Sequence, residues 1–81
     1  MDDQGHLKWR CRRGVRELDV VLDAWLNNAY PTASSAQRLA FAELLAMSDP
    51  QLFDVLLGRA DVADVVQREV VAELRRLSRR R

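Results

Sequence analysis

Apolar residues recur at helical spacing through most of this chain. The clearest run places apolar side chains three, four, seven, eight and eleven positions after the first, at Leu18, Val21, Leu22, Trp25, Leu26 and Ala29. This spacing puts all of them on one face of an α-helix. Tyr30-Pro31 ends the run, because the residue before a proline is pushed away from helical backbone angles. The pattern therefore predicts a helix from about residue 18 to residue 29 with one buried face.

Two further helices are marked by the residues at their starts. Ser34 followed by Gln37 is typical of a capping box, in which the two side chains bond the free backbone N–H groups of a first helical turn. Asp49-Pro50 predicts an N-cap followed by proline at the first helical position. The helix after Ser34 is predicted to have an inner face of Phe41, Leu44 and Leu45, with Leu39, Ala42 and Ala46 beside it. The helix after Asp49 carries Leu52, Phe53, Leu56 and Leu57 and is predicted to end at Gly58.

The two ends of the chain add one helix each. Leu7–Arg12 forms a short predicted helix that Gly14 ends, since glycine readily takes the positive φ at which chains leave helices. Asp61 is predicted to cap a last helix, and arginines at its end complement the helix dipole. The inward residues predicted for it are Val62, Val65, Val66, Val70, Leu74 and Leu77. No hairpin signal occurs, so we predict an all-α fold, a compact five-helix bundle in one domain (1–81), with a core over about 7–77 and a basic tail at 78–81.

Charge is distributed unevenly along the 81 residues, although the net charge is only +1. Residues 1–16 carry five basic and two acidic side chains, residues 17–74 carry ten acidic and three basic ones, and residues 75–81 add five arginines. Such an uneven charge distribution, with an acidic middle and basic ends, bears on which partners the protein binds more than on its fold. The C-terminal arginines favour weak phosphate binding at most, because a pI of about 8.0 is low for a dedicated nucleic-acid binder.

Composition argues against an enzyme and against a metal site. His6 and Cys11 are the only histidine and cysteine, whereas a structural zinc needs about four ligands. No glycine-rich phosphate loop occurs. Cys11 is either a reactive thiol of low pKa among arginines or a small buried hydrophobic residue, and we favour the second. A lone cysteine, no apolar run of about 20 residues and no signal peptide predict a protein of the bacterial cytoplasm that does not enter the membrane.

The segment CRRGVRELD, residues 11–19, is the candidate site. Three arginines and two acids surround Gly14 there: Arg12, Arg13, Arg16, Glu17 and Asp19. One interpretation is a helix junction whose charged side chains are simply solvated. The other is a docking surface, because arginine pairs in bidentate fashion with carboxylates of a partner. The residues alone leave both interpretations open.

Two motifs resemble a known family, the SdhE-type FAD assembly factors. Arg13-Gly14-x-x-Glu17, followed by Leu18-Asp19, resembles their RGxxE motif. Residues 49–53, with Leu56 after them, resemble their D-P-x-L-F-x-x-L segment. The likeness extends over about residues 7–77, and the order and spacing of the two motifs make it specific. The chain departs from the family at Val55, where many members have tryptophan, and at Val15, where many have methionine or leucine.

The resemblance implies an assembly chaperone rather than an enzyme. Such a protein binds the flavoprotein subunit of succinate dehydrogenase, fumarate reductase or both, and promotes covalent attachment of FAD to a histidine of that subunit. By this likeness Arg13, Gly14 and Glu17 would contact the partner, with Arg12, Arg16 and Asp19 beside them. The FAD would belong to the partner, with no cofactor held stably here, and we expect a monomer. An alternative, suggested by small size and basic ends, is an antitoxin-like or regulatory binder of cytoskeletal or nucleic-acid targets.

Overall fold

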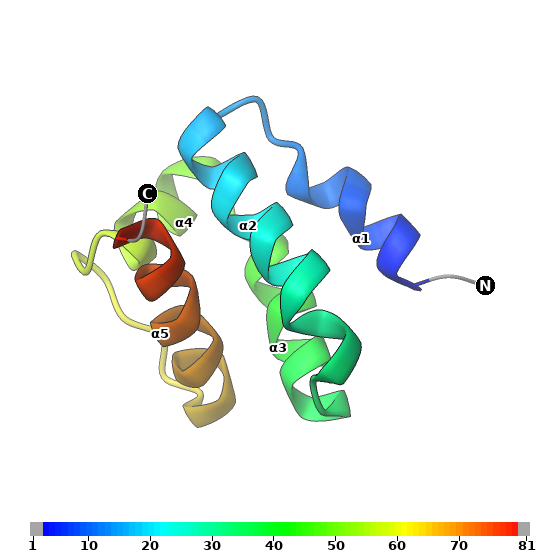
Figure 1. The fold of residues 1–81 in the computed structure, drawn as a ribbon. Coiled ribbons are helices and arrows are strands. Elements are labelled where there is room, and N and C mark those ends of the chain that lie inside the picture. Colours follow the sequence, from blue (N-terminus) through cyan, green and yellow to red (C-terminus); the bar gives the residue numbers. More distant parts are fainter. Residues whose placement is uncertain (1–2, 80–81) are drawn as a thin grey trace.

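A computed structural model describes residues 3–79, with side chains from residue 5 onward, as an assembly of helices (Figure 1). Residues 80 and 81 of the predicted basic tail lie outside this range, and its first two residues, Ser78 and Arg79, end the last helix. The elements are α1 (Asp3–Cys11), α2 (Arg16–Asn28), the 3₁₀ helix η1 (Tyr30–Thr32), α3 (Ser35–Leu45), α4 (Asp49–Leu56) and α5 (Val65–Arg79). The predicted all-α, five-helix fold is confirmed, with η1 as an unpredicted single turn.

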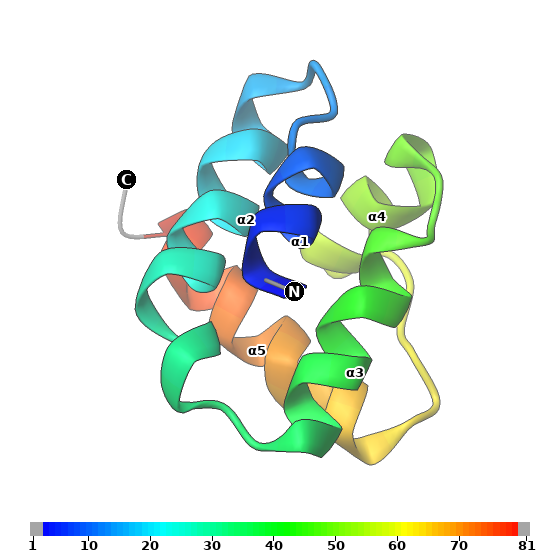
Figure 2. The same ribbon diagram turned by 90° about the vertical axis from the view of Figure 1, so that its right-hand side faces the viewer.

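Helix α2 holds the fold together, because α1, η1 and α5 all pack against it. Helix α3 packs on α5 and on α1, and α4 packs on α5. In Figure 2, α1 lies in front between α2 and α3, and α5 lies behind them. The result measures 35 × 28 × 24 Å. None of the helices within residues 3–79 is long and apolar enough to cross a membrane.

The core is built around an aromatic cluster from three elements. The rings of Trp25 and Phe41 stack with centroids 4.4 Å apart, and the Tyr30 ring meets Trp25 edge-on at 6.2 Å. The indole Nε1 of Trp25 donates a hydrogen bond to Glu73 Oε1 at 3.1 Å, which satisfies the one polar atom of a buried ring. The buried face predicted for α2 is confirmed at Leu18, Val21, Leu22, Trp25 and Leu26, with Ala29 half-buried against the core.

Serine, and not aspartate, caps the start of α4. The capping box predicted at Ser34 and Gln37 is confirmed for α3. The same box recurs at Ser48 and Gln51, so the prediction of Asp49 as the N-cap was wrong. Asp49 is instead the first residue of α4, because Ser48 Oγ already accepts the N–H of Gln51, at 3.3 Å. The carboxylate of Asp49 is thereby left free for another contact.

The ends of three other helices also differ from the predictions. Helix α1 begins at Asp3 and ends at Cys11, rather than spanning residues 7–12. Helix α2 begins at Arg16, two residues before its apolar run. Helix α5 begins at Val65, where Asp64 Oδ1 accepts the N–H of Gln67 at 2.9 Å, so the predicted cap at Asp61 was wrong. Asp61 lies in the loop before the helix, where its carboxylate faces Arg75.

Val65, which was predicted to face inward, lies at the surface, and so do three apolar residues that were predicted on or beside the apolar faces of α3 and α4. Each of them neighbours other apolar residues, and one face of a helix cannot bury a whole apolar run. The exposed residues are Leu39, Ala46, Leu57 and Val65. Val55 and Val71, which were not assigned to the core, are buried instead. The departure from the family pattern at Val55 is therefore a core position, at the contact of α4 with the rest of the bundle.

Candidate functional site

The link between α1 and α2, residues 12–15, is the Gly14 turn. Gly14 has φ +82°, which confirms the prediction that the chain leaves α1 with a positive φ. A Cβ added to Gly14 would meet no atom within 4 Å. The side of this residue that a side chain would occupy therefore opens to the surroundings, and the internal requirement for glycine is conformational only.

The motif residue Arg13 turns toward the interior of the molecule. Its Nε donates to Asp49 Oδ1 at 2.5 Å, its Nη1 donates to the carbonyl oxygen of Leu45 at 2.8 Å, and its Nη2 donates to that of Met47. The side chain is only 13% exposed. These carbonyl oxygens belong to the end of α3 and to the link after it. Carbonyl groups at the end of a helix have no N–H partner within the helix. Arg13 thus fastens the Gly14 turn to the corner between α3 and α4.

This contact joins the two sequence motifs, since Arg13 belongs to the first and Asp49 to the second. Local sequence patterns do not indicate this contact, because the two residues are 36 positions apart and three arginines crowd the same turn. The presence of both motifs in one chain was the only feature of the sequence that could have indicated a contact between them. In the fold, the motifs form one structural unit.

Asp19 closes the Gly14 turn from the other side. Its Oδ1 accepts the backbone N–H of Arg13 at 2.7 Å, and the residue is half-buried in the first turn of α2. Asp19 and the Arg13 side chain therefore hold the backbone on both sides of Gly14. Two of the six predicted site residues build the turn from within.

The other four predicted residues lie on its outer surface. Arg12, Gly14, Arg16 and Glu17 are exposed. Among the side chains that the structure describes, those of residues 5–79, the side chains of Arg12, Arg16 and Glu17 form no hydrogen bond or ion pair. Charged groups that are solvated and unpaired keep their full capacity to pair with a second molecule. The structure therefore separates a supporting layer, Arg13 and Asp19, from an exposed layer.

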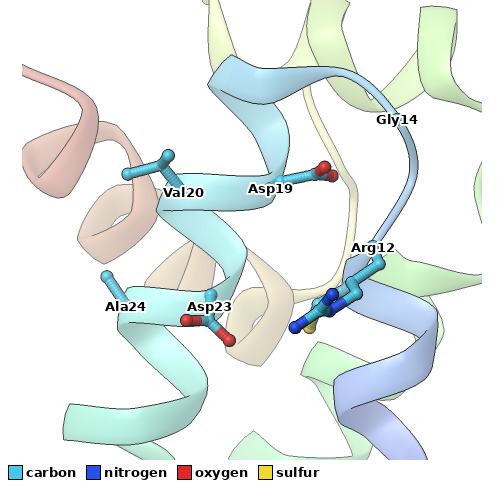
Figure 3. A pocket seen from close by; sticks show the side chains of 7 residues that line it. Arg12, Gly14, Asp19, Val20, Asp23 and Ala24 are labelled. Atoms are coloured by element: carbon cyan, nitrogen blue, oxygen red, sulfur yellow. The ribbon is translucent and has the colours of Figure 1, made fainter.

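An open groove of about 650 Å³ runs beside the turn, between the end of α1 and the first half of α2 (Figure 3). Its walls comprise Cys11, Arg12, Gly14, Asp19, Val20, Asp23 and Ala24. Figure 3 shows the side chains of Arg12 and Asp23 pointing toward each other from the two walls. Among the described residues neither takes part in an ion pair within 4.0 Å. The groove thus offers one cationic and one anionic wall.

The thiol of Cys11 lies buried beside this groove. The pKa of Cys11 is raised from 9.0 to about 11, mainly by burial and next by the negative charge of Asp23. Asp19 acts in the same direction, while the Arg13 guanidinium opposes both. The thiol is neutral at physiological pH, so the alternative of a reactive thiolate was wrong and the interpretation as a buried hydrophobic residue is confirmed.

Recognition by charge and shape is the chemistry that this arrangement can perform. In the described part of the chain, no group of three or more histidine, cysteine or acidic side chains is placed to hold a metal ion. His6 lies exposed on α1, away from Cys11, which is buried. The site consists of a rigid backbone turn flanked by unpaired charges.

Comparison with known proteins identifies the family. The sequence model of a family described as "flavinator of succinate dehydrogenase" matches residues 5–78, which include both motifs. The chain belongs to this family. It is 40% identical over 77 residues to the FAD assembly factor SdhE of Methylococcus capsulatus, a match that covers 95% of this chain and 93% of that one. The family resemblance read from the motifs is thereby confirmed.

Two more distant relatives have the same description. The FAD assembly factor SdhE of Idiomarina loihiensis is 35% identical over 71 residues, which cover 88% of this chain and 79% of that one. The FAD assembly factor SdhE of Pectobacterium atrosepticum is 34% identical over 64 residues, covering 79% and 73%. Family membership therefore concerns nearly the whole helical domain and not the motifs alone.

Proposed function

We propose that this chain is an FAD assembly factor that binds the flavoprotein subunit of succinate dehydrogenase and promotes covalent attachment of FAD to it. Family membership supports the activity. The observation that carries the assignment of the surface is the Gly14 turn, whose exposed charges are unpaired while its backbone is held from beneath by Arg13 and Asp19. A preformed turn loses little conformational freedom on binding, which favours affinity.

Each motif residue has a distinct role in this proposal. Gly14 lets the backbone of the partner approach closely, because no side chain stands in the way. Arg12, Arg16 and Glu17 pair with opposite charges on the flavoprotein subunit. Arg13 and Asp19 are positioning residues that keep this surface in shape. The bond between FAD and the protein forms within the partner, and this chain contributes binding and orientation rather than a catalytic group.

The proposal extends to three points. The flavoprotein subunit of fumarate reductase is a further candidate partner, as the motif resemblance implies. The chain acts as a monomer, so that one Gly14 turn meets one subunit. Its place of action is the bacterial cytoplasm, where a lone cysteine stays reduced.

Nucleic acid is less well supported as a target. Four arginines bind backbone carbonyl groups of the chain itself: Arg13, Arg38, Arg68 and Arg75. Their guanidinium groups serve the fold, which reduces the number that remains for phosphate contacts. The basic side chains left over on the outer surface lie mainly near the two ends of the chain.

The direct test uses cells that express a flavoprotein subunit of succinate dehydrogenase and lack any assembly factor of this family. Covalent flavin is read as in-gel fluorescence of the denatured subunit, with and without this chain. We expect fluorescence to rise several-fold when the chain is present, and the Glu17→Ala variant to give an intermediate level. Equal fluorescence with and without the chain, at equal subunit abundance, would refute the proposal.

A further inference from the structure

Among the described residues, Trp9 is the most exposed large apolar one, with 79% of its surface accessible. Helix α1 contacts α2 and α3 through Leu7 and Cys11, which are both buried. Trp9 lies midway between them in sequence, and a rotation of about 100° per residue puts it on the opposite side of the helix. The fold therefore does not use this indole, although tryptophan is costly to leave in water.

The surroundings of the indole are open and basic. A shallow hollow of about 280 Å³ is lined by Gly5, Lys8, Trp9 and Arg12. Gly5 lies one helical turn before Trp9. Because Gly5 has no side chain, it leaves one side of the indole ring uncovered. Lys8 and Arg12 are exposed, and neither takes part in an ion pair within the described residues.

This hollow and the groove beside the Gly14 turn share a lining residue. Arg12 lines both the hollow around Trp9 and the groove beside the turn. From residue 5 to residue 16 the sequence contains basic side chains and no acidic one. One basic surface therefore runs from Trp9 over the end of α1 to the turn, with an aromatic ring at its outer end.

We propose that Trp9, Lys8 and Arg12 form a second docking element, which binds an acidic segment of the flavoprotein subunit. This inference rests on the proposed function. The indole enters an apolar recess of the partner, while Lys8 and Arg12 pair with carboxylates around it. Tryptophan and arginine are enriched among residues that dominate binding energy, and such residues lie where contact excludes water. Charge complementarity selects an acidic partner surface.

The first test compares Trp9→Ala with a matched control, Leu57→Ala. Leu57 is 56% exposed and lies after α4, beside a different turn. We expect Trp9→Ala to weaken binding of the purified flavoprotein subunit by about 10- to 100-fold in calorimetric titration, a range typical of a dominant interface residue. The control should stay within about twofold of the parent, and circular dichroism of both variants should match it.

A second measurement reads the indole itself. Fluorine NMR of the chain labelled with 5-fluorotryptophan gives one resonance each for Trp9 and the buried Trp25, and a Trp9→Phe variant assigns them. Adding the unlabelled subunit should shift or broaden the Trp9 resonance far more than that of Trp25. An unchanged Trp9 resonance in a complex that forms would overturn the inference.

The outcomes separate this inference from the proposed function. If Gly14→Arg abolishes binding and Trp9→Ala leaves it unchanged, the docking element at Trp9 is refuted while the assembly function stands. If the parent chain does not bind the subunit at all, both the docking element at Trp9 and the proposed function are refuted. If Trp9→Ala weakens binding and Gly14→Arg does not, the element at Trp9 stands and the role of the Gly14 turn fails.

Discussion

The Gly14 turn and the Gly58 turn, residues 57–64 between α4 and α5, are built alike. Their glycines have φ of +82° and +81°, and at neither would an added Cβ meet an atom within 4 Å. Each turn is accompanied by an arginine that binds the end of a neighbouring helix. Arg13 binds the carbonyl oxygens of Leu45, the last residue of α3, and of Met47 just after it, and Arg75 Nη2 donates to the carbonyl oxygen of Val55 in α4 at 2.7 Å.

The two turns differ in what their charged side chains do. At the Gly58 turn, Arg59 Nε lies 3.5 Å from Asp54 Oδ1, and Arg75 Nη2 lies 3.5 Å from Asp61 Oδ1. At the Gly14 turn, the outer charges of Arg12, Arg16 and Glu17 have no such partners among the described residues. Both turns thus combine a glycine of positive φ with an arginine that binds carbonyl groups at the end of a neighbouring helix, and this combination by itself does not mark a binding site. Unpaired charge is what distinguishes the turn that we propose to bind a partner.

The largest effect on stability is expected from Arg13→Ala. The substitution leaves Asp49 and two carbonyl groups without their donor, which should lower the free energy of unfolding by about 2–4 kcal/mol. Arg75→Ala at the Gly58 turn should cost about 1–2 kcal/mol, because that side chain is more exposed and mainly serves one carbonyl. Urea unfolding measures both. Arg12→Ala is the control, and a cost for it equal to that of Arg13→Ala would contradict the separation into two layers.

A pH effect on stability is expected from Cys11, which is buried at the end of α1 directly before the Gly14 turn. Folding raises the pKa of this thiol from 9.0 to about 11. Above pH 9 the unfolded chain loses the proton while the folded chain keeps it, so stability falls as pH rises toward 11. The loss reaches about 2–3 kcal/mol. Thiolate absorbance in the ultraviolet should titrate near pH 11 in the folded protein, and the Cys11→Ala variant should show a smaller loss of stability over the same range. A titration midpoint near 9 would contradict the burial of the thiol.

Similar, smaller costs are expected from Gly14→Ala and Gly58→Ala. Both glycines have positive φ and open space at Cβ, so the strain of about 1–2 kcal/mol comes from the backbone alone. Thermal melting followed by circular dichroism measures it. A much larger loss of stability for Gly14→Ala would show that the added methyl group clashes with its surroundings, contrary to the open space at this position.

The smallest effect is expected from removing residues 78–81. Ser78 and Arg79 are exposed at the end of α5, and terminal residues of this kind contribute little packing. The free energy of unfolding should change by less than about 0.5 kcal/mol, and flavinylation should remain near the parental level. A large loss of covalent flavin would place the basic tail in the docking surface.

Local periodicity sufficed for most of the fold. The apolar spacing from Leu18 to Leu26 and the capping box at Ser34 depend on residues within one or two helical turns, and the structure confirms both. The box at Ser48 and Gln51 has the same spacing and was equally readable. It was missed because Asp49-Pro50 satisfies a competing capping rule.

Long-range contacts could not be predicted in this way. Nothing local distinguishes Arg13 from Arg12, yet one guanidinium is fixed inside the fold and the other is exposed. Their fates depend on where Leu45, Met47 and Asp49 lie after folding. The same limit applies to Trp9, since periodicity places an aromatic residue on a helix but does not show whether another element covers it.

The variants Gly14→Arg and Gly58→Arg test whether the Gly14 turn, and not the Gly58 turn, binds the flavoprotein subunit. Both glycines adjoin an arginine in sequence, have nearly the same φ and have room for a side chain, so both variants should fold with a similar loss of stability. The measurement is pull-down of the flavoprotein subunit by each folded variant. We predict that Gly14→Arg no longer binds, because the new side chain blocks the turn, and that Gly58→Arg binds like the parent. Retained binding by Gly14→Arg, or an equal loss in both, would contradict this prediction.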